Sequence, residues 1–331
     1  MGRVSSANRP FSLTPRTVGI LAAVITVAIW TSFIVIARAA ALRNMTPFDI
    51  VYVRIIGASV ILLPWGWWIV RQEKLPGWLG ISPYPLKMTA LAGVFGGLGY
   101  ALLAYWGFVF APATHASVLM PGSLPLWTTL IAIWLLHDKP SRARAIGLGF
   151  ILVGDLLVGG SSLLHAFDGG EVWKGDLLFM SGALCWSFYS VLVRRHALAA
   201  VKATIAITCF AAVMYLPTYT VLLLTGLAGS TLAVAPWGEI VFNMLFQGVG
   251  SVVISGITFT KMVQHFGPVR STMITAVVPG LSALGAVLFL NEPLHWNLLA
   301  GLALVTLGIT FGVRSHAKAP VSSTPAAKIA P

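Results

Sequence analysis

Long, uninterrupted apolar runs dominate the pattern of hydrophobic and polar positions along the chain. A helix that crosses a bilayer needs about 20 mostly apolar residues, and runs of that length recur from the first residues to the last. Transmembrane barrel strands alternate between apolar and polar side chains, so these unbroken runs predict helices. We predict ten spans, at 17–37, 48–70, 86–108, 112–136, 144–160, 173–193, 203–225, 238–260, 271–290 and 295–313.

The two halves of the chain repeat each other when the sequence is shifted by 154 residues. The shift places Ser117 on Ser271, Pro125 on Pro279, Ala132 on Ala286, Asp138 on Glu292, Gly147 on Gly301, Leu148 on Leu302 and Gly154 on Gly308. Five spans fall in each copy, and an odd number inverts the second copy relative to the first. Inverted repeats of this kind are typical of carriers with a solute path between their halves.

These patterns together predict an all-α polytopic membrane protein, in which two inverted five-helix repeats surround a central cavity. The repeats are expected at 17–160 and 173–313, with the connection 161–172 as a loop. The flanking segments 1–16 and 314–331 are rich in Pro, Ser, Ala and basic residues, and are expected to be disordered cytoplasmic tails.

Composition supports a chain solvated by lipid. Hydrophobic residues make up 57% of it and charged residues only 9%, with a mean hydropathy of +0.88. The net charge is +12, but its distribution argues against a nucleic-acid surface. If the chain starts inside, 17 Lys and Arg residues lie in inner segments and three, Arg38, Arg43 and Lys174, lie in outer ones. The positive-inside rule then places both termini in the cytoplasm, in a plasma membrane of the bacterial inner-membrane type.

Several classes of protein find no support in the sequence. The short connections leave no room for a soluble catalytic domain, and a P-loop of the form GxxxxGK[ST] is absent. Paired acids or a His/Asp cluster for lipid chemistry are absent too, so we expect neither enzymatic activity nor a cofactor nor a metal. The alternative from another class of protein is a membrane-embedded protein that does not transport, either a lipid-acting enzyme or a sensor.

Duplicated motifs give the chain a family resemblance. The first set is Trp30-Thr31-Ser32-Phe33 with Arg38, then Pro125, Asp138, Gly147 and Gly154; the second is Trp186-Ser187-Phe188-Tyr189 with Arg194, then Pro279, Asn291-Glu292-Pro293-Leu294, Gly301 and Gly308. They resemble the EamA-type branch of the drug/metabolite transporter superfamily, although that family more often has Glu where this chain has Asp138. The resemblance implies a cavity lined mainly by spans one to four and six to nine. It also implies solutes such as amino acids, their derivatives or small amphipathic compounds, which are often exported.

The eighth span carries the strongest candidate for a cavity face. Asn243, Gln247, Ser251 and Ser255 recur every four residues, which places them close to one face of an α-helix. Polar groups facing lipid would lose water without replacement, so the stripe is expected to line a cavity or to bond another helix. The third span instead has small residues, Gly93, Gly97 and Ala104, around Tyr100. That face favours close helix packing, with Tyr100 as a cavity candidate.

Aromatic side chains lie inside the first and sixth spans. Trp30 with Phe33, and Trp186 with Tyr189, share helix faces by their spacing of three residues. They can stack on an aromatic, apolar or cationic solute, or simply pack the core.

Arg54 is a cation within a span, roughly 9 Å from the outer end of its helix at 1.5 Å per residue. It could bind a solute carboxylate, pair with Asp176 or Glu239, or extend toward the headgroups. Asp176 and Glu239 are each expected in the first turn of a helix. Capping of the helix is the favoured role there, and proton coupling is the more specific alternative. His115 is a further candidate for coupling, with capping or packing as the alternative.

Proline residues within spans are predicted to kink them. Pro125 and Pro279 interrupt backbone hydrogen bonding at repeat-related positions, and Pro121 adds a second break. Asp138 and Glu292, at the ends of the same helices, are expected to act as caps or loop ties.

The sequence as a whole predicts a secondary transporter of small metabolites. Its partners are a small-molecule solute and membrane lipid, with possible proton coupling and no nucleic acid. Export of amino acids or related compounds by alternating access is the leading hypothesis; multidrug efflux and metabolite uptake are the alternatives. The sequence carries no signal for an oligomeric state.

Overall fold

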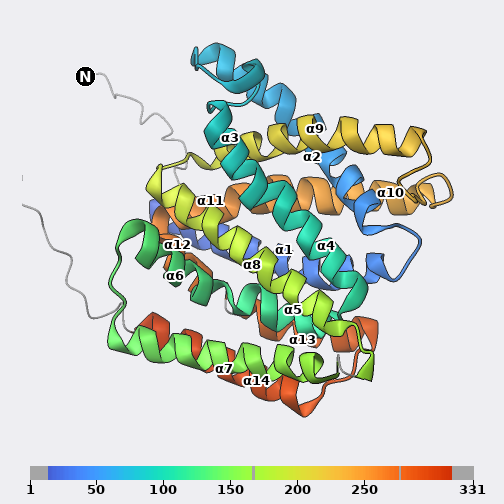
Figure 1. The fold of residues 1–331 in the computed structure, drawn as a ribbon. Coiled ribbons are helices and arrows are strands. Elements are labelled where there is room, and N and C mark those ends of the chain that lie inside the picture. The colour runs from blue at the N-terminus through green and yellow to red at the C-terminus, as the bar shows by residue number, and fades with distance from the viewer. Residues whose placement is uncertain (1–13, 166–167, 276, 315–331) are drawn as a thin grey trace, which may run out of the picture.

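Helices account for all the regular structure in the described part of the chain. The computed structural model (Figure 1) describes residues 14–165, 168–275 and 277–314. Most of the predicted tails lie outside these residues, but α1 already begins at Pro15 and α14 ends at Arg314. The helices are α1 (Pro15–Ala41), α2 (Pro47–Gln72), α3 (Leu86–Gly93), α4 (Gly99–Phe110), α5 (Ala113–Ser117), α6 (Leu124–Leu136), α7 (Arg142–His165), α8 (Val172–Arg195), α9 (Ala200–Leu224), α10 (Trp237–Asn243), α11 (Ser255–Phe266), α12 (Pro268–Ile274), α13 (Val277–Leu290) and α14 (Trp296–Arg314).

The predicted ten-helix membrane fold is confirmed. Nine helical stretches among the described residues are long and apolar enough to cross a membrane, and the apolar part of α14, Trp296–Phe311, is shorter. The fifth predicted span, 144–160, is too short, because α7 continues to His165. Ser162 is accommodated in that extension because its hydroxyl donates to the Gly159 carbonyl oxygen and to Asp176 of α8.

Helix α2 shows how the sequence fixes a helix start. Thr46 and Asp49 form a capping box, in which each side chain bonds the backbone N–H of the other residue, and Pro47 occupies the first turn. Asp49 is completely buried and also accepts hydrogen bonds from Tyr219 and from Ser230 and Thr231, after α9. One carboxylate therefore starts α2 and ties it to the second half of the chain.

The two halves pack mainly against each other. Helix α1 lies along α11 and α13, α2 along α9, and α4 along α8. Helices α7 and α14 pair at one edge of the bundle, at the bottom of Figure 1. We call the end where α1 begins and α8 ends, on the left in Figure 1, the tail end, and the opposite end the far end.

Three π-helical segments interrupt the spans: Val94–Leu98 in the third, Val118–Gly122 in the fourth and Met244–Ile254 in the eighth. In a π-helix each N–H bonds the carbonyl five residues back, so each turn is wider than in an α-helix. The predicted stripe of Asn243, Gln247, Ser251 and Ser255 assumed α-helical spacing, and that assumption is wrong across the third of these segments.

Two of the three prolines predicted to kink helices in mid-span lie in the first turn of a helix instead. Pro125 is the second residue of α6, and Pro279 is the third residue of α13, so both occupy first turns, where a missing N–H costs no hydrogen bond. Pro121, in contrast, lies within a π-helical segment. The fourth and ninth spans are thus each divided into two helices rather than bent at Pro125 and Pro279.

Glycines repeated between the halves bring α7 and α14 into backbone contact. A Cβ atom on Gly154 would lie 2.7 Å from the Gly301 carbonyl oxygen, and one on Gly301 would lie 2.9 Å from the Gly154 carbonyl oxygen. Gly308 in the same way approaches the Gly147 carbonyl oxygen. Small residues permit such approach between membrane helices.

We predict that Gly301→Val separates α7 from α14 and destabilises the fold by about 1–3 kcal/mol, the usual cost of overpacking. Thermal unfolding of the detergent-purified protein measures the change. Gly149→Val is the matched control, because a Cβ atom at Gly149 meets nothing within 4 Å. Equal stability of the two variants would contradict the proposed close contact.

Candidate functional site

An aromatic cluster occupies the centre of the bundle, where both halves contribute side chains. The Trp186 ring contacts the rings of Trp30 at 5.6 Å, Tyr100 at 5.0 Å, Phe259 at 5.2 Å and Tyr189 at 5.3 Å between centroids. The Trp30 indole N–H donates to Ser255 Oγ at 2.8 Å. The predicted aromatic faces of the first and sixth spans therefore meet each other.

Two small cavities adjoin this cluster, and Trp186 lines both. The Arg54 cavity, of about 40 Å³, is lined by residues that include Arg54, Trp186, Thr208 and Ser251. The Trp30 cavity, of about 20 Å³, is lined by residues that include Trp30, Phe33, Tyr100, Pro121 and Trp186. A cavity of about 10–15 Å³ holds one water molecule, so both are water-sized in this closed arrangement.

The lining of the two cavities follows the arrangement that the family resemblance implied. Together they are bounded by helices of spans one to four and six to nine, and no described residue of α7 or α14 takes part. Either cavity lies between the halves, because each takes residues from both. Both cavities thus lie at the interface of the two repeats, where a central site is predicted.

Arg54 forms neither of the ion pairs predicted for it. Its side chain is only 7% exposed, so it does not extend to the headgroups either. The guanidinium lies over the Tyr105 ring, 5.3 Å from its centroid, and Nη1 is buried without a hydrogen-bond partner. Asp176 is paired with His115 instead. Burial of a lone cation in a membrane protein is costly, which keeps Arg54 a candidate site residue.

Two more buried donors of the Arg54 cavity are without partners: Trp186 Nε1 and Thr208 Oγ1. The residues that line either cavity and are described by the structure include no carboxylate. The polar side-chain groups of the described lining residues are therefore hydroxyls, indole N–H groups and one positive charge, without a negative charge.

The polar residues of the eighth span divide between different environments. Gln247 is fully buried and accepts a hydrogen bond from Tyr105 at 2.7 Å through Oε1. Asn243 donates to the Glu239 carbonyl oxygen at 2.9 Å. Only Ser251 of the three lines the Arg54 cavity. Gln247 thus supports the site through Tyr105, whose ring contacts Arg54, whereas Asn243 lines a separate pocket with Arg43 and Glu239.

The glycine face of the third span packs against neighbouring helices, as predicted. A Cβ atom on Gly93 would lie 2.4 Å from the Phe210 side chain, and one on Gly97 would lie 2.5 Å from Ile207. Gly96, outside the predicted face, would in the same way meet the Tyr189 ring at 2.6 Å. Tyr189 shares a 2.8 Å hydrogen bond with Thr260 and lines neither cavity. Tyr189 is therefore a packing residue in this arrangement.

Two ion pairs join the halves at opposite ends of the bundle. Arg38 pairs with Glu292 at the far end, and Arg194 pairs with Asp138 at the tail end. Asp138 and Glu292 are repeat mates, and each arginine follows its motif tryptophan, Trp30 or Trp186, by eight residues. The same pair thus occurs twice, once at each end, as inversion of the repeat requires.

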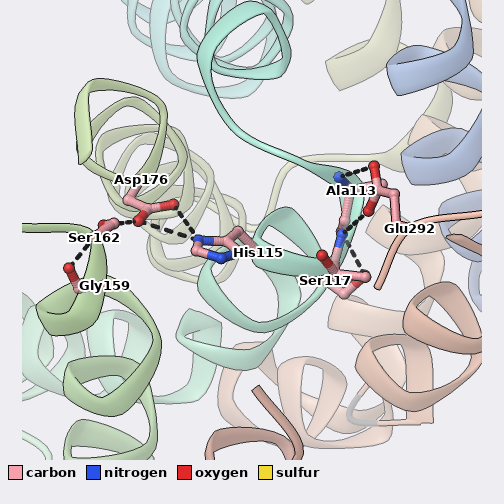
Figure 2. Close-up of polar contacts among 8 residues, drawn as sticks. Ala113, His115, Ser117, Gly159, Ser162, Asp176 and Glu292 are labelled. Carbon is pink, nitrogen blue, oxygen red and sulfur yellow. Dashed lines mark hydrogen bonds and ion pairs between the residues drawn. The ribbon is translucent and has the colours of Figure 1, made fainter. Parts of the chain in front are cut away.

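The far-end tie, formed by Arg38, Glu292, Ala113 and Thr114, is closed. Figure 2 shows the Glu292 carboxylate accepting the backbone N–H groups of Ala113 and Thr114, at 2.9 Å each. Arg38 Nε lies 3.5 Å from the same carboxylate, and its Nη1 donates to the Phe108 carbonyl oxygen at 2.5 Å. The Arg38 and Glu292 side chains are 16% and 10% exposed.

The tail-end pair, Arg194 and Asp138, is open by comparison. Its 2.8 Å contact is made by side chains that are 47% and 29% exposed. Asp138 and Arg194 line a pocket of about 620 Å³ that also includes Gly267–Arg270, at the start of α12. Since α12 is the repeat mate of α5, the pocket occupies the place of the contacts that Glu292 makes at the far end.

A second contact between the halves at the far end involves His115 and Asp176. The His115 Nδ1 atom lies 3.0 Å from Asp176 Oδ1, and Ser162 donates to the other carboxylate oxygen (Figure 2). Because the serine bonds the carboxylate and not the histidine, this is not a nucleophile–base arrangement.

Asp176 lies beyond the first turn of α8, so the predicted capping role is wrong for it, whereas Glu239 does lie in the first turn of α10.

Metal ligation finds no support in the described part of the chain, where no three His, Cys, Asp or Glu residues gather closely enough.

Some residues of the site are not predicted from the sequence. Thr208 belongs to a span in which no polar pattern is recognised, and Phe259 follows the last serine of the eighth-span stripe by four residues but is not polar. The Arg38–Glu292 pairing could have been found from the repeat, since both residues belong to duplicated motifs.

Comparisons with known proteins agree with this architecture of paired repeats. Residues 17–160 and 173–314 match the EamA-like transporter family. The chain belongs to that family, within the drug/metabolite transporter superfamily, and is therefore an integral membrane transporter rather than an enzyme.

Relatives in other organisms carry the same general description. The chain is 23% identical over 235 residues to "Uncharacterized transporter YyaM" of Bacillus subtilis strain 168, covering 70% of this chain and 75% of the relative. It is 24% identical over 244 residues to "Uncharacterized transporter YoaV" of the same organism, covering 72% and 78%. A solved structure titled "Crystal structure of protein" superposes with a TM-score of 0.62 at 20% identity, over 92% of this chain and 100% of the other. That likeness supports the fold.

We predict that Ser255→Ala destabilises the protein by about 1–3 kcal/mol, because it leaves the Trp30 indole N–H without an acceptor in the core. Ser32→Ala is the control on α1, since the exposed Ser32 hydroxyl bonds only a carbonyl of its own helix. Thermal unfolding monitored by tryptophan fluorescence compares the two. A loss in Ser32→Ala as large as in Ser255→Ala would contradict the assigned role.

Proposed function

We propose that the chain exports small amphipathic metabolites, amino acids or related compounds, by alternating access between its two repeats. The observation that carries the proposal is the asymmetry of the two repeat-related ion pairs. The far-end tie is closed by two backbone hydrogen bonds, while a pocket separates the tail-end pair from α12. Exchange of the two arrangements would open the far end and close the tail end, because the repeats are inverted copies.

The sidedness follows from charge. The tail end carries the Lys- and Arg-rich connections, Lys139 to Arg144, Arg194 to Lys202 and Lys261 to Arg270. The positive-inside rule makes it the cytoplasmic end, with both termini on that side. The present arrangement then has its closed tie on the outer side and its more exposed ion pair on the cytoplasmic side, as expected of an exporter before it takes up its solute, although surface pockets of about 460 and 920 Å³ also lie at the outer end.

Among the residues predicted as candidates for proton coupling, His115 and Asp176 are the favoured pair. His115 and Asp176 are in direct contact and join α5 to α8 at the far end, so a change in charge of either would alter the contact between the halves. Glu239 lies on α10, away from that contact, and suits coupling less well.

Multidrug efflux of cations and metabolite uptake are the competing functions. A buried Arg54 in a cavity without carboxylates repels cationic drugs, which disfavours the first. Uptake would use the same geometry with the opposite net direction.

We predict that cells expressing the gene release a small carboxylate-containing metabolite into the medium, relative to cells lacking it. Comparative metabolite profiling of medium and cells measures this without a prior choice of solute. Intracellular accumulation of the metabolite would instead indicate uptake. Efflux of cationic dyes without any change in metabolites would replace the proposal by multidrug efflux.

We predict that Glu292→Gln and Asp138→Asn shift the access of the central site in opposite directions. The reporter is Ser251→Cys in a background of Cys185→Ser and Cys209→Ala, labelled from outside by a membrane-impermeant maleimide. Glu292→Gln weakens charge-assisted bonds worth about 1.5–3 kcal/mol each, so labelling from outside should rise by roughly tenfold or more.

Asp138→Asn, the repeat mate of that change, should lower labelling from outside, because it destabilises the arrangement in which the tail end is closed. The reporter alone, with both carboxylates intact, is the baseline for the comparison. Equal labelling in all three proteins would contradict alternating access through these ties.

A further inference from the structure

We propose that the central site binds a monocarboxylate that has a flat apolar or aromatic body and no ammonium group. This assignment rests on the proposed transport function and narrows its solute class. It would make the solute a deaminated or N-acylated relative of an amino acid rather than the zwitterionic amino acid itself.

The unpartnered donors of the Arg54 cavity identify the charged end of the solute. Arg54, Trp186 and Thr208 all line one cavity, and each has a buried donor atom without a hydrogen-bond partner: Nη1, Nε1 and Oγ1. Buried donors without acceptors are rare in folded proteins, and a set of three around one cavity is complementary to an acceptor that enters it. A carboxylate supplies only acceptor oxygens, and its planar geometry matches the guanidinium.

The single positive charge limits the solute to a monoanion. Arg54 is the sole cation among the described residues that line either cavity. A phosphate monoester or a dicarboxylate would bring a second negative charge without a counter-charge into a low-dielectric site. A monocarboxylate leaves the occupied site neutral.

The absence of acceptors for a cation argues against an ammonium group. No carboxylate occurs among the described lining residues of either cavity. Asp49, an acid on the helix that carries Arg54, is already engaged by Thr46, Tyr219, Ser230 and Thr231. An ammonium group would therefore lose its hydration and gain no ionic partner, in addition to repulsion by Arg54.

The body of the solute is defined by the rings on the other side of Trp186. The Trp30 cavity is lined by Trp30, Phe33 and Tyr100 together with aliphatic side chains. Because Trp186 lines both cavities, a change in the position of this one ring would join the donor site to the aromatic one. A flat apolar body can then stack on these rings while its carboxylate meets Arg54.

The test uses three probes that share one body: 3-phenylpropanoate, L-phenylalanine and 2-phenylethylamine. They carry a carboxylate alone, a carboxylate with an ammonium, and an ammonium alone. Binding to the purified full-length protein at pH 7.5 is followed by quenching of tryptophan fluorescence. We expect 3-phenylpropanoate to bind at least about tenfold more tightly than either other probe, since one charge-assisted pair separates them.

Variants at Arg54 test the donor directly. Arg54→Gln should abolish binding of 3-phenylpropanoate, and Arg54→Lys, which keeps the charge for folding, should weaken it by about tenfold because the planar guanidinium is lost. Arg71→Gln is the matched control on the same helix, since Arg71 is exposed and stacks on Trp67 near the end of α2. It should bind like the unaltered protein.

The outcomes separate this assignment from the carrier function. Equal or tighter binding of L-phenylalanine or 2-phenylethylamine, failure of all three probes to bind, or unchanged binding in Arg54→Lys would each overturn the assignment. Proteoliposome flux of L-phenylalanine without a preference for the carboxylate would also overturn it and leave the carrier function standing. Binding of 3-phenylpropanoate without any flux would support the assignment and contradict the carrier function.

Discussion

The structure is governed by the lack of water in the hydrocarbon of the bilayer, which obliges polar groups to find partners inside the protein. Most of them do: Asp49 gathers four donors around the start of α2, and Tyr105 bonds Gln247. Several buried polar atoms of the described residues do not, and those of Arg54, Trp186 and Thr208 belong to side chains that share a cavity. The general rule makes this grouping informative, because a fold can tolerate unsatisfied donors where a ligand satisfies them in turn.

Duplication with inversion explains why the ends of the bundle resemble each other chemically but differ in contact. Each repeat contributes an arginine from its first span and a carboxylate from the end of its fourth, and the two pairs face opposite sides of the bundle. The Arg38–Glu292 pair is reinforced by backbone N–H groups, whereas Arg194–Asp138 is left at the wall of a pocket. One set of interactions can therefore serve two states, since closing one end and opening the other exchanges equivalent bonds.

Hydrophobic patterning predicted the spans, the repeat and the aromatic faces of Trp30 and Trp186, because these depend on periodicity and symmetry that the residues carry locally; the contact between the two faces is seen only in the structure. The environment of single polar residues was harder to predict. The sequence leaves three roles open for Arg54, namely binding a solute carboxylate, pairing with Asp176 or Glu239, and extending to the headgroups, because the partner of a side chain depends on how helices far apart in sequence are rotated. The α-helical spacing predicts that Asn243 and Gln247 share one face with Ser251, toward a cavity or another helix; Gln247 does bond Tyr105 of α4, but the π-helical turns of Met244–Ile254 do not follow that spacing. Pro125 and Pro279 begin helices because the breaks precede them.

The π-helical segments have a mechanical consequence. Each holds an extra residue per turn relative to an α-helix, and a turn that reverts to the α-helical form must pass that residue along the chain. Passing it would rotate and advance the helical portion beyond the segment while leaving the portion before it in place. Three spans can therefore rotate one part of the helix relative to the other part while their backbone hydrogen bonds stay within the helix. The π-helical segments that allow this are Val94–Leu98, Val118–Gly122 and Met244–Ile254.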